Sequence, residues 1–189
     1  MMDIDYIDKT INTLHEGGTI LFPTDTIWGI GCDATNAEAV KKIYQIKNRP
    51  SDKPLIILAS STTMVKEYVK QIHPKIETLL IYHQRPITVI YEKAKNLPEE
   101  LISKDQSIAI RIPQDQFCRM LVEKFGKPLV ATSANISNEP FPKSFGEIQS
   151  TILKRVDHIV PYRQNEEITS EPSVIIRMSQ KGDLEFLRE

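Results

Sequence analysis

The sequence is poor in cysteine and has no long apolar run. Its two cysteines, Cys32 and Cys118, are far apart and in no metal-like spacing, which argues against a disulfide framework and a zinc site. No stretch approaches the ~20 apolar residues of a membrane span, and the acidic start lacks the basic and apolar regions of a secretory signal. We therefore expect a cytoplasmic protein with no membrane partner, no zinc and no redox cofactor.

The chain also lacks an excess of charge of either sign. Its 24 Lys and Arg residues nearly cancel its 25 Asp and Glu residues, which leaves a formal net charge of -1. No overall basic field attracts nucleic acid, so any local group of cations needs an explanation by position. With 40% apolar residues in 189, the chain can bury one core, and we expect a single domain over residues 1–189.

Apolar periodicity alternates between strand and helix patterns, which predicts an α/β fold. Strands are expected at Thr19–Phe22, Leu55–Ala59, Ile87–Tyr91, Ser107–Arg111, Leu129–Thr132, His158–Val160, Ser173–Met178 and Leu184–Leu187. Helices are expected at Ile4–Leu14, from an Asn36 cap to Ile46, and at Thr62–Val69, Pro74–Tyr82, Asp115–Phe125 and Ser144–Leu153. The last two strands can pair as a hairpin, so the sheet should be mixed.

Three cations gather at the end of the second predicted helix. Lys47, Arg49 and Lys53 lie close together, and Pro50 and Pro54 fix the path of the backbone around them. Guanidinium and ammonium groups held in this way suit phosphate oxygens. On composition alone, solvated cations at a helix C-terminus explain the cluster equally well.

A second segment, from Pro23 to Gly31, places small hydroxyls before a Gly-x-Gly. The glycines would let a ligand approach the backbone. The segment matches neither a dinucleotide fingerprint nor a P-loop. A tight strand-to-helix turn with Trp28 in the core is the simpler interpretation.

Polar residues also follow the strand that ends near Thr132. Ser133 and Asn135 can form a turn or a cap, or they can contact a ligand. Ligands in open α/β sheets bind at the carboxyl ends of strands, which is where Thr26, Arg111 and Ser133 are predicted to lie. We therefore expect these three side chains to converge.

The ordered set of motifs is more specific than any one of them. It comprises Pro23-Thr24-Asp25-Thr26-x-x-Gly29-x-Gly31, Lys47-x-Arg49-Pro50-x-x-Lys53-Pro54-Leu55, Pro86-Ile87-Thr88-Val89, Ile110-Arg111-x-Pro113 and Thr132-Ser133-Ala134-Asn135. This set resembles the YrdC-like family of L-threonylcarbamoyladenylate synthases in its short, single-domain form. The resemblance implies a twisted mixed sheet, parallel and antiparallel, with helices packed on it and an open, concave, positively charged cleft.

The resemblance also implies a nucleotidyltransferase reaction. ATP, L-threonine and bicarbonate would give threonylcarbamoyl-AMP and pyrophosphate, with Mg²⁺ carried by ATP. This is the first step in making N6-threonylcarbamoyladenosine at position 37 of tRNA, which a separate threonylcarbamoyl-transferase complex completes. The alternative is a module that binds double-stranded RNA or tRNA without catalysis.

Roles for particular residues follow from the same resemblance. Catalysis falls to Lys47 and Arg49. The residues implied in ATP binding are Lys47, Arg49, Lys53, Ser107, Ser133, Asn135 and Arg188, and those implied in threonine binding are Thr26, Arg111, Ala131 and Ser173. The chain departs from the family pattern at His83-Gln84-Arg85, at Leu58, where some members have histidine, and at Val174, where Thr is usual.

Overall fold

The computed structural model describes residues 4–167, 172–179 and 181–188. Its strands are β1 (Ile20–Phe22), β2 (Gly29–Gly31), β3 (Ile56–Leu58), β4 (Ile87–Tyr91), β5 (Ile108–Arg111), β6 (Leu129–Ser133), β7 (His158–Ile159), β8 (Val174–Met178) and β9 (Leu184–Arg188). They form one mixed sheet in the order β7-β1-β2-β6-β3-β5-β4-β8-β9. The predicted hairpin is confirmed, because β8 and β9 pair antiparallel around Gly182, whose φ is +80°.

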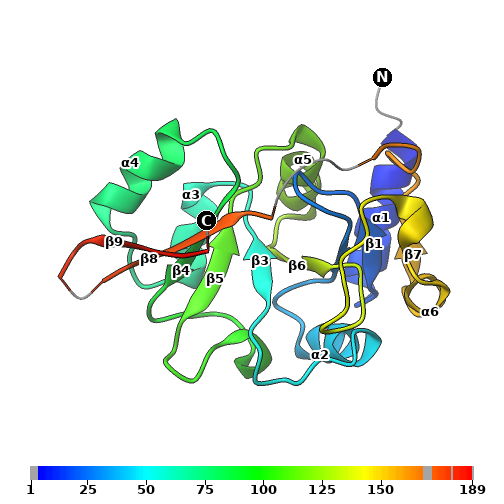
Figure 1. The fold of residues 1–189 in the computed structure, drawn as a ribbon, viewed down its shortest axis with the longest axis horizontal. Coiled ribbons are helices and arrows are strands. Elements are labelled where there is room, and N and C mark those ends of the chain that lie inside the picture. The colour runs from blue at the N-terminus through cyan, green and yellow to red at the C-terminus, as the bar shows by residue number, and fades with distance from the viewer. Residues whose placement is uncertain (1–3, 168–171, 180, 189) are drawn as a thin grey trace.

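The helices lie on the two faces of this sheet (Figure 1). They are α1 (Ile4–His15), α2 (Ala37–Ile46), α3 (Thr62–Tyr68), α4 (Pro74–Tyr82), α5 (Gln116–Phe125) and α6 (Ser150–Leu153), with 3-10 turns at Glu99–Leu101 and Phe145–Glu147. Asn36 caps α2 as predicted, since its side chain accepts hydrogen bonds from two backbone amides of the first turn. Among the described residues, none of these helices has the length and apolar character needed to cross a bilayer.

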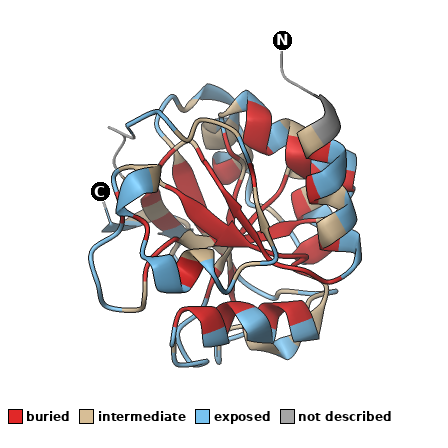
Figure 2. Ribbon diagram, turned by 90° about the vertical axis from the view of Figure 1, so that its right-hand side faces the viewer, coloured by how far each residue is buried: buried red, intermediate tan, exposed pale blue. Residues whose placement is uncertain are grey.

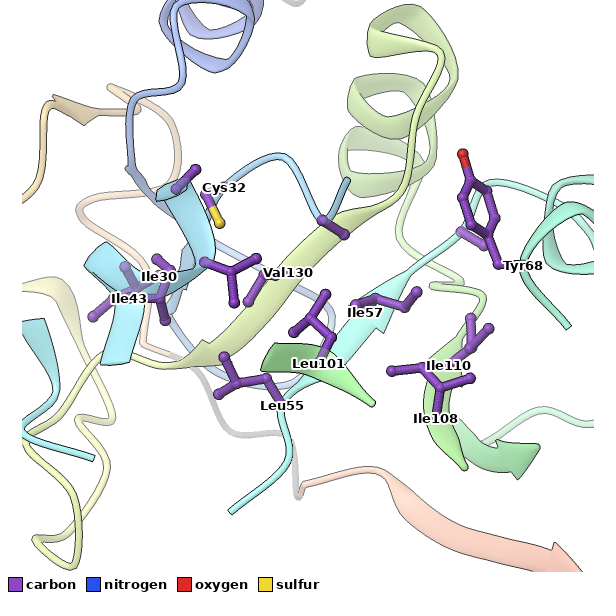
Figure 3. Close-up of a cluster of buried hydrophobic side chains, with 14 of the residues drawn as sticks. Ile30, Cys32, Ile43, Leu55, Ile57, Tyr68, Leu101, Ile108, Ile110 and Val130 are labelled. Carbon is purple, nitrogen blue, oxygen red and sulfur yellow. The ribbon is translucent and has the colours of Figure 1, made fainter. Parts of the chain in front are cut away.

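Two apolar cores stabilise the layers (Figure 2). One lies between the sheet and helices α1 and α5, and it includes Ile7, Leu58 and Leu121. The other is larger and occupies the opposite face, where Ile43 of α2 lies beside Ile30 of β2 (Figure 3). The sheet is thus covered by helices on both sides, as the predicted α/β fold requires.

The Gly-x-Gly segment is a strand, so the turn interpretation was wrong for these residues. Gly31 in β2 faces its neighbours so closely that a Cβ atom would collide with the backbone oxygen of Val130 and lie 2.8 Å from the ring of Phe22. Glycine is therefore required at this position by the packing of the sheet. Trp28 is fully buried in the core, as that same interpretation expected.

Two other expectations need correction. The helix predicted at Ser144–Leu153 is broken into a 3-10 turn and the short α6, with Ile148 extended between them. Gly146 weakens helix formation there, and Phe145 packs against Trp28 with 5.1 Å between ring centroids. The predicted convergence of strand ends holds for Thr26 and Arg111, which are hydrogen-bonded at 2.9 Å. It fails for Ser133, because β5 runs parallel to β3 whereas β6 runs antiparallel to it. Arg111 and Ser133 therefore lie at opposite ends of the central strands of the sheet.

Candidate functional site

A buried lysine organises one end of the site. Lys47 follows the last turn of α2, and its side chain is only 1% exposed. The ammonium donates to the backbone oxygens of Ser133 and Asn135, the second at 2.7 Å, and to Asn135 Oδ1 at 3.2 Å. We call Lys47, Ser133 and Asn135 the lysine cage. Burial lowers the pKa of Lys47 to about 7, and repulsion from Arg49 acts in the same direction.

The proline-flanked loop beside the cage carries the other two predicted phosphate ligands. Arg49 is half-buried, and its guanidinium donates to the backbone oxygens of Lys53 at 3.2 Å and Pro54 at 3.1 Å. The Lys53 ammonium lies 3.3 Å from Asn138 Oδ1. Burial lowers the pKa of Arg49 from its ordinary value. This loop is joined to the segment that follows Asn135, because the Ser137 backbone amide donates to the Lys47 carbonyl at 2.8 Å.

Ser107 lies next to this loop, just before β5. The parallel register pairs Ile56 with Ala109, so Ser107 is beside Pro54 when the register is continued back along the two strands. Its hydroxyl donates to Asp105 Oδ1 at 2.6 Å, and the residue is 8% exposed. Ser107 is thus close to the Arg49 loop, although its hydroxyl is already engaged.

A second cluster surrounds Arg111. The Arg111 side chain is 6% exposed, and Nη1 donates to Thr26 Oγ1 at 2.9 Å. Nη2 lies 3.3 Å from Asp25 Oδ1 in an ion pair. Thr26 is oriented in turn by Thr24, whose hydroxyl lies 3.1 Å from its own. A guanidinium fixed on two sides in this manner suits a carboxylate ligand.

Ser173 and Arg188 extend the Arg111 cluster. The Arg188 guanidinium donates to the Ser173 backbone oxygen at 3.0 and 2.7 Å, and the Ser173 hydroxyl lies 2.7 Å from that of Thr88. Burial and the positive charge of Arg111 lower the pKa of Arg188. We call Asp25, Thr26, Thr88, Arg111, Ser173 and Arg188 the arginine cluster. Arg188 therefore lies with the predicted threonine ligands, apart from the lysine cage.

One face of the sheet connects the cage with the cluster. One row of paired residues crosses the four central strands β4, β5, β3 and β6. Its members are Thr88, Arg111, Leu58 and Leu129, and their side chains share a face. Ala131 and Ser133 follow on the same side of β6, with Ser133 roughly 13 Å beyond Leu129. Ala131 is 8% exposed and lies between the two groups. Thr88, Arg111, Ala131 and Ser133 thus share a face of the sheet, whereas the sequence predicted a shared strand end, and Lys47 reaches Ser133 from the end of α2.

The loop from Pro23 to Trp28 spans the same interval. Thr24 lies against β2, because a Cβ atom on Gly29 would be 3.4 Å from its methyl group. Gly29 is paired with Ser133 of the lysine cage. Thr26, in the middle of the loop, contacts Arg111. The loop therefore links the lysine cage to the arginine cluster.

The three departures from the family pattern lie in ordinary structural roles. Leu58 is fully buried opposite Arg111, and Val174 is 7% exposed and paired with Ile87. His83 ends α4, where its Nδ1 lies 3.1 Å from the Leu80 oxygen. Its backbone oxygen accepts from Gln114, at the border of the arginine cluster.

Sequence reasoning gave no role to Asp25 or Thr88, although both lie inside the motifs that it identified. Asp25 is paired with Arg111, and Thr88 with the hydroxyl of Ser173. The sequence carried a signal for Asp25, because a carboxylate between two threonines directly follows an apolar strand. The register that brings Thr88 opposite Arg111 was not visible.

The fold and the site define a class of protein. It is a mixed α/β protein in which one buried ammonium and two constrained arginines are joined to hydroxyl-bearing loops, an arrangement suited to ligands with several negative charges. The family model named Sua5/YciO/YrdC, described as telomere recombination, matches residues 12–189. The chain belongs to this family.

Individual relatives agree with this assignment. A threonylcarbamoyl-AMP synthase of Pseudoalteromonas translucida is 34% identical over 163 residues, which make up 85% of this chain and 87% of the relative. The structure of Pyrococcus abyssi Sua5 complexed with L-threonine superposes with a TM-score of 0.88 at 28% identity, covering 96% of this chain and 53% of that one. The chain thus spans about half the length of that protein. Escherichia coli YciO, at 21% identity, shares the fold with a TM-score of 0.85 over 99% of this chain and 90% of its own.

Proposed function

We propose that the protein is a threonylcarbamoyl-AMP synthase, a nucleotidyltransferase that converts L-threonine, bicarbonate and ATP to threonylcarbamoyl-AMP and pyrophosphate. The observation that carries this proposal is the placement of the lysine cage and the arginine cluster on one face of the sheet. Family membership and relatives of that name support it. The product would pass to a transferase complex that modifies tRNA in the cytoplasm.

The two ends of the site would divide the substrates. Lys47, Arg49 and Lys53 would bind the triphosphate, with Ser107, Ser133 and Asn135 on the nucleotide side. Thr26, Arg111, Ala131 and Ser173 would bind threonine. Arg188, which contacts Ser173, would reach the nucleotide only where the α-phosphate meets the amino acid, which is where the reaction takes place.

Positioning and charge stabilisation account for catalysis by such a site. The amine of threonine and bicarbonate give a carbamate and water, and a carbamate oxygen forms a bond to the α-phosphorus while the bond to the pyrophosphate oxygen breaks. Lys47 and Arg49 would stabilise the negative charge that develops on the phosphate oxygens. No strong base is needed for this step, which fits a site of cations and hydroxyls.

Magnesium fits this site as a partner of ATP. It prefers oxygen ligands, keeps several waters and is commonly held by substrate phosphates. Among the residues that the structure describes, no group of three or more His, Cys, Asp or Glu side chains is arranged to hold a metal. The Ser133 hydroxyl and the Asn135 amide of the lysine cage would contact the waters of the ion, which would neutralise phosphate charge.

The proposal is tested by measuring pyrophosphate release from ATP. Release should require L-threonine and bicarbonate together, and threonylcarbamoyl-AMP should appear in equal amount. Omitting either substrate should reduce release to the background of ATP alone. Release that continues without bicarbonate would identify a different adenylation reaction, and binding of RNA without any release would favour the non-catalytic alternative.

ATP binding is expected to weaken as pH rises above the pKa of Lys47, which burial lowers to about 7. Only the protonated form attracts phosphate, so loss of the proton removes one cation from the site. Above that pKa the KM for ATP should rise by up to about tenfold per pH unit, over a range of about pH 6 to 9. Lys47→Arg, which stays charged, should flatten this dependence. A wild-type KM that stays constant to about pH 9 would contradict the role given to Lys47.

A further inference from the structure

Asp25 is a buried carboxylate that the proposed division of substrates does not use. Its side chain is 9% exposed, and its Oδ2 accepts a hydrogen bond from the Gln114 backbone N–H at 3.1 Å. The other oxygen, Oδ1, is 3.3 Å from Arg111 Nη2. The carboxylate is thus fixed from behind by the backbone and presents one oxygen to the arginine cluster.

One buried atom of each side chain in this pair makes no hydrogen bond. Asp25 Oδ1 accepts none and Arg111 Nε donates none, and both atoms are buried. A buried charged group without its full set of hydrogen bonds is costly, so a native structure keeps one where something else can complete it. The pair therefore offers one acceptor and one donor, on side chains of opposite charge that are in contact.

A free α-amino acid matches this arrangement. Its carboxylate and ammonium are attached to the same carbon, so a cation and an anion in direct contact can bind both groups at once. We propose that Asp25 binds the α-ammonium of the amino-acid substrate while Arg111 binds its carboxylate. The inference rests on the proposed function and names Asp25 as a further substrate ligand of the same site.

The surrounding charges make the carboxylate necessary. Burial lowers the pKa of Arg188, and repulsion from Arg111 acts in the same direction. Both cations would repel an incoming ammonium. The neighbouring groups Thr26, Thr88 and Ser173 are neutral hydroxyls. Among the described members of the arginine cluster, Asp25 is the one that carries a negative charge, and its ion pair with Arg111 offsets this repulsion.

The inference is tested with two ligands that differ in the amino group. The first is L-threonine, and the second is its analogue with a hydroxyl in place of the α-amino group. Binding of each is measured by titration calorimetry, which needs no turnover. Asp25→Asn should lower the affinity for threonine about tenfold or more, because it removes a charge-assisted hydrogen bond, and should change affinity for the analogue less than about threefold.

Other results would overturn the inference. Equal losses for both ligands would mean that Asp25 only positions Arg111, and no loss for either would remove it from the site. Asp33→Asn is the matched control, since Asp33 is a buried carboxylate paired with Lys127 at 2.8 Å, and it should leave both affinities unchanged. If Asp25→Asn does not fold, Asp25→Glu replaces it. Its carboxylate is charged but displaced, so the affinity for threonine should fall more than the affinity for the analogue.

The wild-type protein separates this inference from the proposed function. It should bind threonine at least about tenfold more tightly than the analogue, and equal binding would contradict the role of Asp25. Binding of threonine without pyrophosphate release would refute the synthase activity and leave the role of Asp25 intact. If pyrophosphate release depends on threonine but Asp25→Asn weakens binding of threonine and of the analogue equally, the synthase activity stands and the role of Asp25 is refuted.

Discussion

Replacing Lys47 by methionine is expected to reduce kcat/KM for ATP by about a thousandfold. Methionine has nearly the volume of the lysine stem, so the change removes the ammonium with little loss of packing. Loss of one preorganised donor in an active site costs about 10²- to 10³-fold in rate, and Lys47 is also the most deeply buried of the three cations. Initial rates of pyrophosphate release at varied ATP measure the effect.

Stability provides the second readout for Lys47→Met. The Asn135 backbone oxygen loses its Lys47 donor, whereas the Ser133 oxygen keeps the Asn135 backbone amide at 2.9 Å. One unpaired buried acceptor costs about 1–3 kcal/mol. Removing a buried charge offsets part of this cost, so the variant should remain folded with a lower free energy of unfolding. Lys41→Met is the matched control, because Lys41 is an exposed lysine of the same helix paired with Glu38. A loss of activity in both variants, or in neither, would contradict the assignment.

Local signals in the sequence predicted the elements that carry the cage. The Asn36 cap and Pro50 define where α2 begins and where it cannot continue, which fixes Lys47 at its end. The ammonium was expected to be solvated or to face a phosphate. The structure instead encloses it among the oxygens of the 133–135 segment, because the antiparallel pairing of β2 with β6 brings that segment back over the end of α2.

The sequence did not predict the register or the relative direction of the strands. The apolar pattern identifies β5 and β6, but a pattern of period two does not state which direction the strands run relative to each other. The rule for parallel sheets therefore predicted a shared strand end for Arg111 and Ser133, whereas the two residues share a face of the sheet. Gly29–Gly31 was missed because β2 is short and its glycines lack the β-branched signal of a strand. The close approach of Val130 and Phe22 that requires Gly31 comes from distant parts of the chain.

The near-neutral charge of the chain now has a structural counterpart. Many exposed cations are paired with acids, such as Lys66 with Glu77 and Arg177 with Glu185. Lys47 and Arg49 instead donate to carbonyl oxygens, which satisfy hydrogen bonds without neutralising the charge. A ligand with several negative charges can therefore gain from both cations, although the protein as a whole has no basic field.

Arg111→Lys is expected to raise the KM for threonine about a hundredfold while the KM for ATP changes less than about threefold. The guanidinium contacts Thr26 and Asp25 through separate nitrogens and keeps Nε unengaged. A single ammonium at this position keeps the charge but cannot hold both partners and present a further donor. Charge-assisted hydrogen bonds contribute about 1.5–3 kcal/mol, which corresponds to a loss of about 10- to 150-fold.

The separation of the two KM values is the decisive measurement for Arg111→Lys. Arg177→Lys serves as the control, because Arg177 is an exposed arginine of β8 paired with Glu185 at 2.6 Å, and both KM values should stay at their wild-type levels. Because the lysine cage is roughly 13 Å along the sheet from the row of Arg111, the nucleotide should be insensitive to the loss of the fork. An equal rise in both KM values would show that one ligand occupies both ends of the site, and the division of substrates would have to be abandoned.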